Sequence, residues 1–129
     1  MTEDVDAQQN TRVFVVEDEF LLAIALEEDL RRSGFAVVGP FNRLARALKA
    51  AAEEAFDLAV VDINLNGEMA FPLIDELQRR HVPTLILSGY GVANLPARFH
   101  DVPRLGKPAE PRALLARVRQ LAAGRGQGA

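Results

Sequence analysis

Four short apolar runs constrain the fold more strongly than any other feature of the sequence. They lie at residues 13–16, 35–39, 58–61 and 84–88. Polar and apolar residues do not alternate within them, a pattern typical of strands buried on both faces in a parallel sheet that helices cover. A weaker fifth run, 102–105, contains Pro103, which favours the edge of the sheet because proline cannot donate a ladder hydrogen bond.

Helical patterns fill the intervals between the apolar runs. The predicted helices span residues 19–33, 42–54, 68–80 and 110–122. Leucines recur every four residues in the first helix, and Gly34 is suited to cap its C-terminus. Asn42 is suited to cap the N-terminus of the second helix. Pro96 predicts a short or distorted helix within 92–100, because proline in a helix interior costs about 3 kcal/mol.

The alternation of strands and helices predicts one α/β domain over residues 12–122 of the 129-residue chain. The expected architecture is a flavodoxin-like, doubly wound, five-stranded parallel sheet, (βα)5, with strand order 2-1-3-4-5. Residues 1–11 and 123–129 are expected to be flexible. In such sheets ligands bind beyond the carboxyl ends of the strands, at the switch point between the first and third strands.

Composition and charge exclude several classes of function. The net charge of −3 argues against a nucleic-acid partner, since proteins that bind nucleic acid normally carry a basic stripe. The absence of cysteine excludes disulfides, thiol catalysis and thiolate metal sites. No apolar run approaches the about 18 residues of a membrane span, so no membrane partner is expected. The polar, acidic start is unlike a signal peptide, which favours a cytoplasmic location.

Polar side chains follow the apolar runs at the points where the strands should end. Glu17 and Asp18 follow the first run, and Asp62 follows the third. Ser88 ends the fourth run, and Lys107 follows the fifth. Because parallel strands present their carboxyl ends at one edge of the sheet, we expect these five side chains to converge there.

Three converging carboxylates require compensation. Two like charges about 4 Å apart repel by roughly 4 kcal/mol at an effective dielectric constant near 20, and Lys107 supplies only one positive charge. A hard divalent ion such as Mg²⁺, which prefers oxygen ligands, suits the remainder. A carboxylate beside Mg²⁺, with a lysine and a hydroxyl nearby, has the parts needed for phosphoryl transfer. Asp62 would be the nucleophile and Ser88 a hydrogen-bond partner of the phosphoryl group.

The segments "VVEDE", "VVDINL", "LILSG" and "GKP", in this order and at this spacing, resemble the response-regulator receiver domain of two-component signalling across residues 12–122. The resemblance implies that Asp62 accepts a phosphoryl group from a sensor histidine kinase or a histidine phosphotransfer protein. It also implies that Lys107 binds a phosphoryl oxygen, with a cis Lys107–Pro108 bond.

The resemblance further implies the ligands of a Mg²⁺ cofactor. Asp18 and Asp62 would ligate the ion directly, Glu17 would act largely through water, and Asn64 would offer its backbone carbonyl.

Two features depart from the usual receiver pattern. Receivers carry an aromatic switch residue three positions before the lysine, where this chain has Arg104. Tyr90, two positions after Ser88, resembles instead a subgroup of stand-alone receivers with a Thr/Ser-Gly-Tyr motif. The candidate switch residues are therefore Ser88, Tyr90 and Arg104, with a surface-loop tyrosine as the alternative for Tyr90. The usual proline in the loop after Asp62 is also missing, and Asn66 and Gly67 occupy that loop.

Ordinary structural roles are the alternatives for the other candidate residues. Glu17 and Asp18 could form the N-cap and first turn of the following helix. Asp62 could cap the turn after its strand, Ser88 could be a turn residue, and Lys107 could be solvated. The arginines of the last helix are expected on a solvated face, with a surface for partner docking as the alternative.

Three functions are consistent with this pattern to different degrees. The favoured hypothesis is a single-domain response regulator, a monomer or weak dimer, which signals by protein contact on its strand 4–strand 5 face or by onward phosphotransfer. The alternative is a Mg²⁺-dependent phosphatase with an Asp nucleophile, but the position two residues after Asp62 holds Asn64, which is no proton donor of the required kind. A dinucleotide binder is disfavoured, because acids replace the Gly-rich loop that such proteins need after the first strand.

Overall fold

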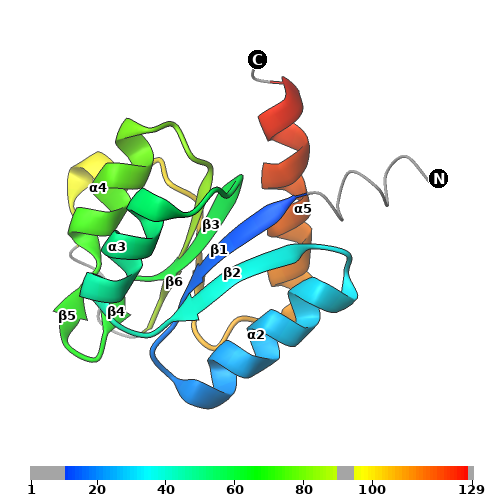
Figure 1. Cartoon of the computed structure of the whole chain (residues 1–129), viewed down its shortest axis with the longest axis horizontal. Coiled ribbons are helices and arrows are strands. Elements are labelled where there is room, and N and C mark those ends of the chain that lie inside the picture. The colour runs from blue at the N-terminus through cyan, green and yellow to red at the C-terminus, as the bar shows by residue number, and fades with distance from the viewer. Residues whose placement is uncertain (1–10, 90–94, 128–129) are drawn as a thin grey trace.

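The computed structural model describes residues 11–89 and 95–127, with side chains described as far as residue 124. In this part of the chain, five parallel strands form one sheet in the order β2-β1-β3-β6-β7 (Figure 1). Counted along the chain, this is the predicted order 2-1-3-4-5, so the predicted fold class is confirmed. The strands are β1 (Arg12–Val16), β2 (Ala36–Phe41), β3 (Leu58–Asp62), β6 (Thr84–Ser88) and β7 (Arg104–Gly106).

Helices cover both faces of the sheet (Figure 1). The helices α2 (Phe20–Arg32) and α5 (Pro111–Gln127) pack on one face, and α3 (Leu44–Glu53), α4 (Phe71–Arg79) and the short 3₁₀ helix η2 (Ala97–Phe99) pack on the other. None of the helices within the described residues is long and apolar enough to cross a membrane.

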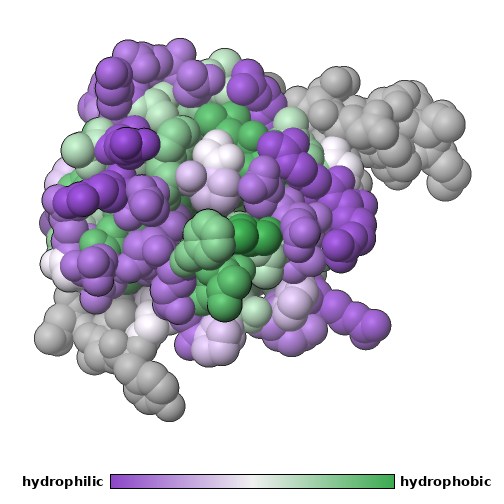
Figure 2. Space-filling view, turned by 60° about the horizontal axis from the view of Figure 1, so that its bottom comes forward, coloured by the Kyte–Doolittle hydropathy of each residue, from purple (hydrophilic) through white to green (hydrophobic). Residues whose placement is uncertain are grey.

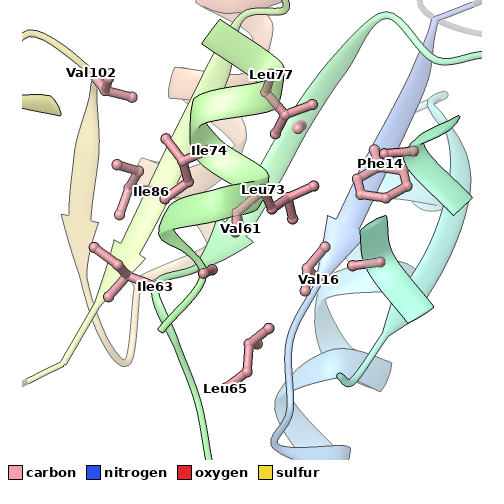
Figure 3. Packing of buried hydrophobic residues seen from close by; sticks show 14 of the residues in the cluster. Phe14, Val16, Val61, Ile63, Leu65, Leu73, Ile74, Leu77, Ile86 and Val102 are labelled. Carbon is pink, nitrogen blue, oxygen red and sulfur yellow. The ribbon is translucent and has the colours of Figure 1, made fainter. Parts of the chain in front are cut away.

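The core has two layers, one on each side of the sheet. Phe14 and Val16 of β1 contact the cluster under α3 and α4, together with Val61, Ile74 and other residues that Figure 3 shows. The intervening residues of β1 join the cluster under α2 and α5. Successive side chains of a strand point to opposite faces, so β1 is apolar throughout because both of its faces are buried.

Helix α2 ends as the sequence predicts. Gly34 has a φ of 97°, and its N–H donates to Arg31 O at 3.0 Å. The next N–H, that of Phe35, donates to Leu30 O at 3.0 Å, which completes a Schellman motif. Glycine suits this position because it adopts a positive φ at no steric cost.

The predicted start of α3 is wrong. Asn42 is not its N-cap, because the capping position is Arg43, whose side chain makes no capping hydrogen bond. Instead, the N–H of Leu44 in the first turn donates to Glu68 Oε1 at 3.4 Å. A carboxylate from a distant segment of the chain therefore takes the place of a local cap.

The predicted start of α4 at residue 68 is also wrong. Residues 64–69 form an antiparallel hairpin of β4 (Asn64–Leu65) and β5 (Glu68–Met69), so the helix begins only at Phe71. The turn consists of Asn66 and Gly67, with φ values of 58° and 94°. An Asn-Gly pair is the commonest two-residue hairpin turn, because both of its residues tolerate positive φ.

Two further predictions differ at the chain ends. Thr11, assigned to the flexible N-terminus, is 2% exposed, and its carbonyl accepts the N–H of Ala36 at 3.0 Å. Residues 1–10 lie outside the described residues. Helix α5 continues to Gln127 rather than ending at 122. Alanines follow residue 121, and Gly124 and Gly126 each cost only about 1 kcal/mol in a helix. Within 92–100, the described residues form only η2 after Pro96, which agrees with the predicted short helix.

Candidate functional site

Three carboxylates meet at the carboxyl end of the sheet. Glu17 and Asp18 follow β1, and Asp62 is the last residue of β3, the strand beside β1. One carboxylate oxygen from each residue lies within 4.8 Å of the others. Glu17 and Asp62 are each only 2% exposed, whereas Asp18 is half-buried. The structure therefore brings the three predicted acids together at the switch point of the sheet.

A bulge at the end of β2 helps to place Glu17. The β1–β2 register shifts between Phe14 and Val16, and Gly39 of β2 lies there with a φ of +109°. A Cβ on Gly39 would lie 2.7 Å from Val15 O, so glycine is required by both its backbone conformation and the close approach of β1. Beyond the bulge, the N–H of Glu17 donates to Phe41 O at 2.9 Å.

Lys107 reaches the acids from the loop after β7. Its Nζ lies 2.7 Å from Asp62 Oδ2, 3.0 Å from Glu17 Oε2 and 3.0 Å from Glu19 Oε1. Its side chain is 11% exposed. Its backbone N–H donates to Ser88 O at 2.7 Å, which ties the loop to the end of β6, and the Lys107–Pro108 bond is cis, as the resemblance implied.

The burial of these charges shifts their proton affinities. Burial raises the pKa of Glu17 from 4.5 to about 7, although the N–H of Glu19 and the ammonium of Lys107 oppose the shift. Burial also raises the pKa of Asp62, and the neighbouring Asp18 carboxyl adds to this effect. The pKa of Lys107 is raised, because its hydrogen bonds to the carboxylates outweigh the effect of burial, which lowers it. The cluster therefore has an excess of negative charge that one lysine does not balance.

The β4–β5 hairpin holds the loop beside Asp62. The N–H of Asn64 donates to Asp62 Oδ1 at 3.1 Å, and the Asn64 side-chain oxygen accepts the N–H of Gly67 at 2.7 Å. The exposed Asn64 side chain therefore belongs to the hairpin turn, while its backbone lies next to the phosphoacceptor candidate.

An open cavity of about 710 Å³ leads from the surface to Asp62 and Lys107, and Glu19, Leu21, Asn64 and Gly89 are among the residues that line it. A second cleft of about 800 Å³ adjoins it on the hairpin side, and both are lined by Asp18 and Glu19. The acids are thus accessible to a small anionic group from one side of the molecule.

Two of the remaining predicted residues lie on the neighbouring strands β6 and β7. Ser88 is the half-buried last residue of β6, level with Gly106 of β7. Arg104 is the exposed first residue of β7 and lies beside Ile86. Tyr90 lies outside the described residues.

The residue that sequence reasoning missed is Glu19. It lines both cavities and contacts Lys107 Nζ, yet the sequence places it merely at the start of a helix. The available signal was a third consecutive acid in "EDE". The N-cap position of α2 is in fact Glu19, and its side chain makes no capping hydrogen bond. The alternative that Glu17 and Asp18 form this cap is therefore wrong.

The donor set of the cluster fits a hard divalent cation. Within the described residues, the group of acids and histidines that could hold a metal ion is Glu17, Asp18 and Asp62. Their donor atoms are all carboxylate oxygens, which Mg²⁺ prefers, and excess negative charge favours a cation. A site for zinc or copper would be expected to include nitrogen or sulfur ligands.

Comparison with known proteins agrees with this geometry. A family model described as the response regulator receiver domain matches residues 13–119. The chain is 27% identical over 111 residues to the transcriptional regulatory protein PdtaR of Mycobacterium tuberculosis, covering 85% of this chain and 54% of that protein. It is 34% identical over 121 residues to the response regulator protein FleR of Pseudomonas aeruginosa, covering 88% of this chain and 25% of FleR. The chain thus spans about half the length, or less, of these relatives.

Two solved structures illustrate the similarity of fold. SdrG from Sphingomonas melonis matches with a TM-score of 0.76 and 31% identity, covering 88% of this chain and 97% of that one. A CheY-like receiver domain protein from Methanospirillum hungatei matches with a TM-score of 0.83 over 92% of this chain and 98% of that one. At 19% identity, the second match supports the fold alone.

Proposed function

Because this chain belongs to the response regulator receiver domain family, we propose that Asp62 accepts a phosphoryl group from a phosphohistidine of a sensor histidine kinase or a histidine phosphotransfer protein. The observation that carries this proposal is the position of Asp62. Its carboxylate lies at the switch point, 2.7 Å from the Lys107 ammonium and beside two further acids, at the base of an open cavity.

The proposed reaction uses the residues as they lie. A carboxylate oxygen of Asp62 attacks phosphorus, and an O–P bond forms while the P–N bond to the donor imidazole breaks. The imidazole nitrogen that leaves takes up a proton from solvent. Lys107 then donates a hydrogen bond to a phosphoryl oxygen and stabilises its charge. Ser88, at the end of β6, would hydrogen-bond the phosphoryl group once it is attached.

Asp18 and Asp62 would hold Mg²⁺ directly, with Glu17 acting through water and the backbone carbonyl of Asn64 as a further ligand. When bound, the ion neutralises charge on the transferring oxygens. The excess of carboxylates over lysine supports this assignment, because the single charge of Lys107 does not offset the repulsion among three acids.

The contacts of Asn64 support a phosphoacceptor rather than a phosphatase. A phosphatase of the kind considered needs a proton donor two residues after its nucleophile. The Asn64 side chain is an amide, and its oxygen accepts the N–H of Gly67 in the hairpin turn. The proposal therefore comprises self-catalysed phosphorylation and dephosphorylation of Asp62, without turnover of another substrate.

An apolar patch next to the cavity supports docking of the phosphodonor there. Phe20 and Leu21 are 75% and 77% exposed, and Ile24 is also exposed, all in the first two turns of α2. Figure 2 shows apolar side chains surrounded by hydrophilic ones on the face that carries the start of α2. Since Leu21 also lines the cavity, a protein that delivers a phosphoryl group to Asp62 would cover this patch.

The downstream partner and the oligomeric state stay predictions. Signalling through the strand 4–strand 5 face, here β6 and β7, rests on the exposed Arg104 and on the edge position of β7. The monomer or weak dimer, and the cytoplasmic location, are likewise parts of the proposal.

Phosphorylation with a small donor tests the assignment of Asp62. Incubation of the wild-type chain with radiolabelled acetyl phosphate and Mg²⁺ should label it, and EDTA should prevent the labelling. Asp62→Asn should remain unlabelled, whereas Asp101→Asn, which changes an exposed acid, should label as wild type does. Stable labelling of the Asp62→Asn variant would exclude Asp62 as the acceptor.

The docking patch is tested with two donors in parallel. Leu21→Ser should slow transfer from a phosphorylated phosphotransfer protein and leave the rate with acetyl phosphate unchanged. An equal loss with both donors would indicate damage to the site itself rather than to the patch.

A further inference from the structure

Three carboxylates surround the ammonium of Lys107, which donates hydrogen bonds to Glu17 and Asp62 and forms an ion pair with Glu19. It has three protons to donate, and three carboxylate oxygens lie within 3.0 Å of Nζ, from Glu17, Glu19 and Asp62. A phosphoryl oxygen that binds Lys107 must therefore displace one of these contacts.

The three contacts are not equally replaceable. Glu17 is 2% exposed, and its Oε2 also accepts the N–H of Glu19, which fixes it in place. Asp62 is itself the proposed acceptor, so it remains beside Lys107 in both states. Glu19 is 60% exposed and lines the cavity, at the side from which a phosphoryl group arrives. Exposed ion pairs are worth far less than buried ones, so the Glu19 contact is the weakest of the three.

The backbone position of Glu19 supports a specific contact with Lys107. Glu19 is the N-cap of α2, where a polar side chain ordinarily accepts a hydrogen bond from the first turn of the helix. The structure shows no such bond for Glu19, whose carboxylate lies 3.0 Å from Lys107 Nζ instead.

Building on the proposed function, we propose that Glu19 is a positioning residue that holds Lys107 in the unphosphorylated state and opposes phosphorylation of Asp62. Its carboxylate forms an ion pair with the ammonium on the cavity side, and the incoming phosphoryl oxygen displaces it. Glu19 thereby sets the balance between the free and the phosphorylated forms without contributing to the chemical step.

Three variants separate this role from its alternatives. Glu19→Gln removes the charge and weakens the contact. Glu19→Asp keeps the charge, but its shorter side chain is a better cap for α2 and reaches less far toward Lys107. Glu28→Gln is the matched control, because it removes an exposed acid from the same helix two turns further along.

The rate of phosphorylation by acetyl phosphate is measured at low salt, with Mg²⁺ saturating for each variant. Glu19→Gln should raise the rate about two- to fivefold, the equivalent of about 0.5–1 kcal/mol for an exposed ion pair. It should also lower the dissociation constant for beryllofluoride, a phosphoryl mimic, by a similar factor. Glu19→Asp should show the same changes in rate and in beryllofluoride affinity as Glu19→Gln, whereas Glu28→Gln should behave like wild type. A wild-type rate in Glu19→Asp would mean that the charge acts without the contact, and would overturn the proposal.

The NMR signals of the Lys107 side chain provide a readout that a merely structural role would not change. The ε-methylene shifts of wild type and Glu19→Gln should differ in the free form and coincide in the beryllofluoride complex, because the contact exists only before phosphorylation. Equal differences in both forms would overturn the proposal. Added salt should also reduce the difference in phosphorylation rate between wild type and Glu19→Gln, because salt screens exposed ion pairs.

Labelling of wild type in parallel separates a failure of the proposed role of Glu19 from a failure of the proposed phosphorylation of Asp62. If wild type is labelled and Glu19→Gln reacts at the same rate, only the role of Glu19 is overturned. If wild type takes up no label, the proposed function fails, and the role of Glu19 fails with it.

Discussion

Replacing Glu17 by glutamine should stabilise the metal-free protein at neutral and alkaline pH, although it removes a partner of Lys107. Burial raises the pKa of Glu17 from 4.5 to about 7. Between these values the folded state binds more protons than the unfolded chain, so the free energy of unfolding falls as pH rises through this window. The difference between these two pKa values corresponds to a loss of at most about 3 kcal/mol in the free energy of unfolding once Glu17 is ionised. Glutamine has the same shape and carries no charge, so the variant avoids this loss.

The pH dependence of the difference is the decisive observation. In EDTA, the variant should exceed wild type in free energy of unfolding by up to about 3 kcal/mol at pH 8. The difference should shrink as pH falls and disappear below pH 4.5, where Glu17 becomes protonated in both states. The pKa of Asp62 is also raised from its ordinary value of 3.8. Ionisation of Asp62 therefore also lowers the free energy of unfolding as pH rises, in wild type and in the variant alike.

Urea denaturation followed by circular dichroism measures this difference, because the chain has no tryptophan and only one tyrosine. Glu53→Gln, an exposed acid at the end of α3, is the control and should show no comparable pH-dependent gain. If Glu17→Gln were less stable than wild type at pH 8, or if the two profiles ran parallel, the attractive contact with Lys107 would outweigh the cost of burial. The charge balance derived for the site would then be refuted.

Four further substitutions test the scaffold, each measured by the same denaturation. Gly39→Ala should lower the free energy of unfolding by about 2–4 kcal/mol, because its Cβ would lie 2.7 Å from a backbone oxygen of β1. Gly67→Ala, with a φ of +94° but open space around it, should cost only about 1 kcal/mol, and equal losses would contradict this reasoning. Ile74→Ala should cost about 2–5 kcal/mol, because this side chain of α4 is fully buried against the sheet, and a loss below about 1 kcal/mol would be inconsistent with the packing. Arg80→Ala should cost about 1 kcal/mol, because its guanidinium donates to a carbonyl in the last turn of α3 at 2.8 Å, and full retention of stability by Arg80→Ala would contradict this contact.

The sheet and its order were predictable from the sequence, because a strand that is buried on both faces is apolar at every position. A strand such as "VFVV" has no polar position, whichever face a residue points to. The convergence of Glu17, Asp62 and Lys107 followed from the same logic, since parallel strands bring their carboxyl ends to one edge. For the same reason, residues separated by 45 positions in the sequence could be assigned to one site.

The local boundaries were less predictable, because distant contacts decide them. Asn42 has the side chain of a good N-cap, but α3 begins after Arg43 and receives its hydrogen bond from Glu68. The helical pattern over 68–80 includes two residues that pair in the hairpin instead, because Asn66 and Gly67 form its turn. Side-chain preference is a weak local term, and a tertiary hydrogen bond or a stable turn outweighs it.

By itself, the sequence determined the parallel sheet, the edge where the acids meet and the identity of the lysine that faces them, because apolar burial and strand direction act along the whole chain. Only the tertiary structure decided that Lys107 donates hydrogen bonds to Glu17 and Asp62, and that it also forms an ion pair with Glu19. Those contacts join side-chain atoms 2.7–3.0 Å apart in residues that lie 45 to 90 positions from one another in the sequence, and no periodicity or composition carries a signal for them.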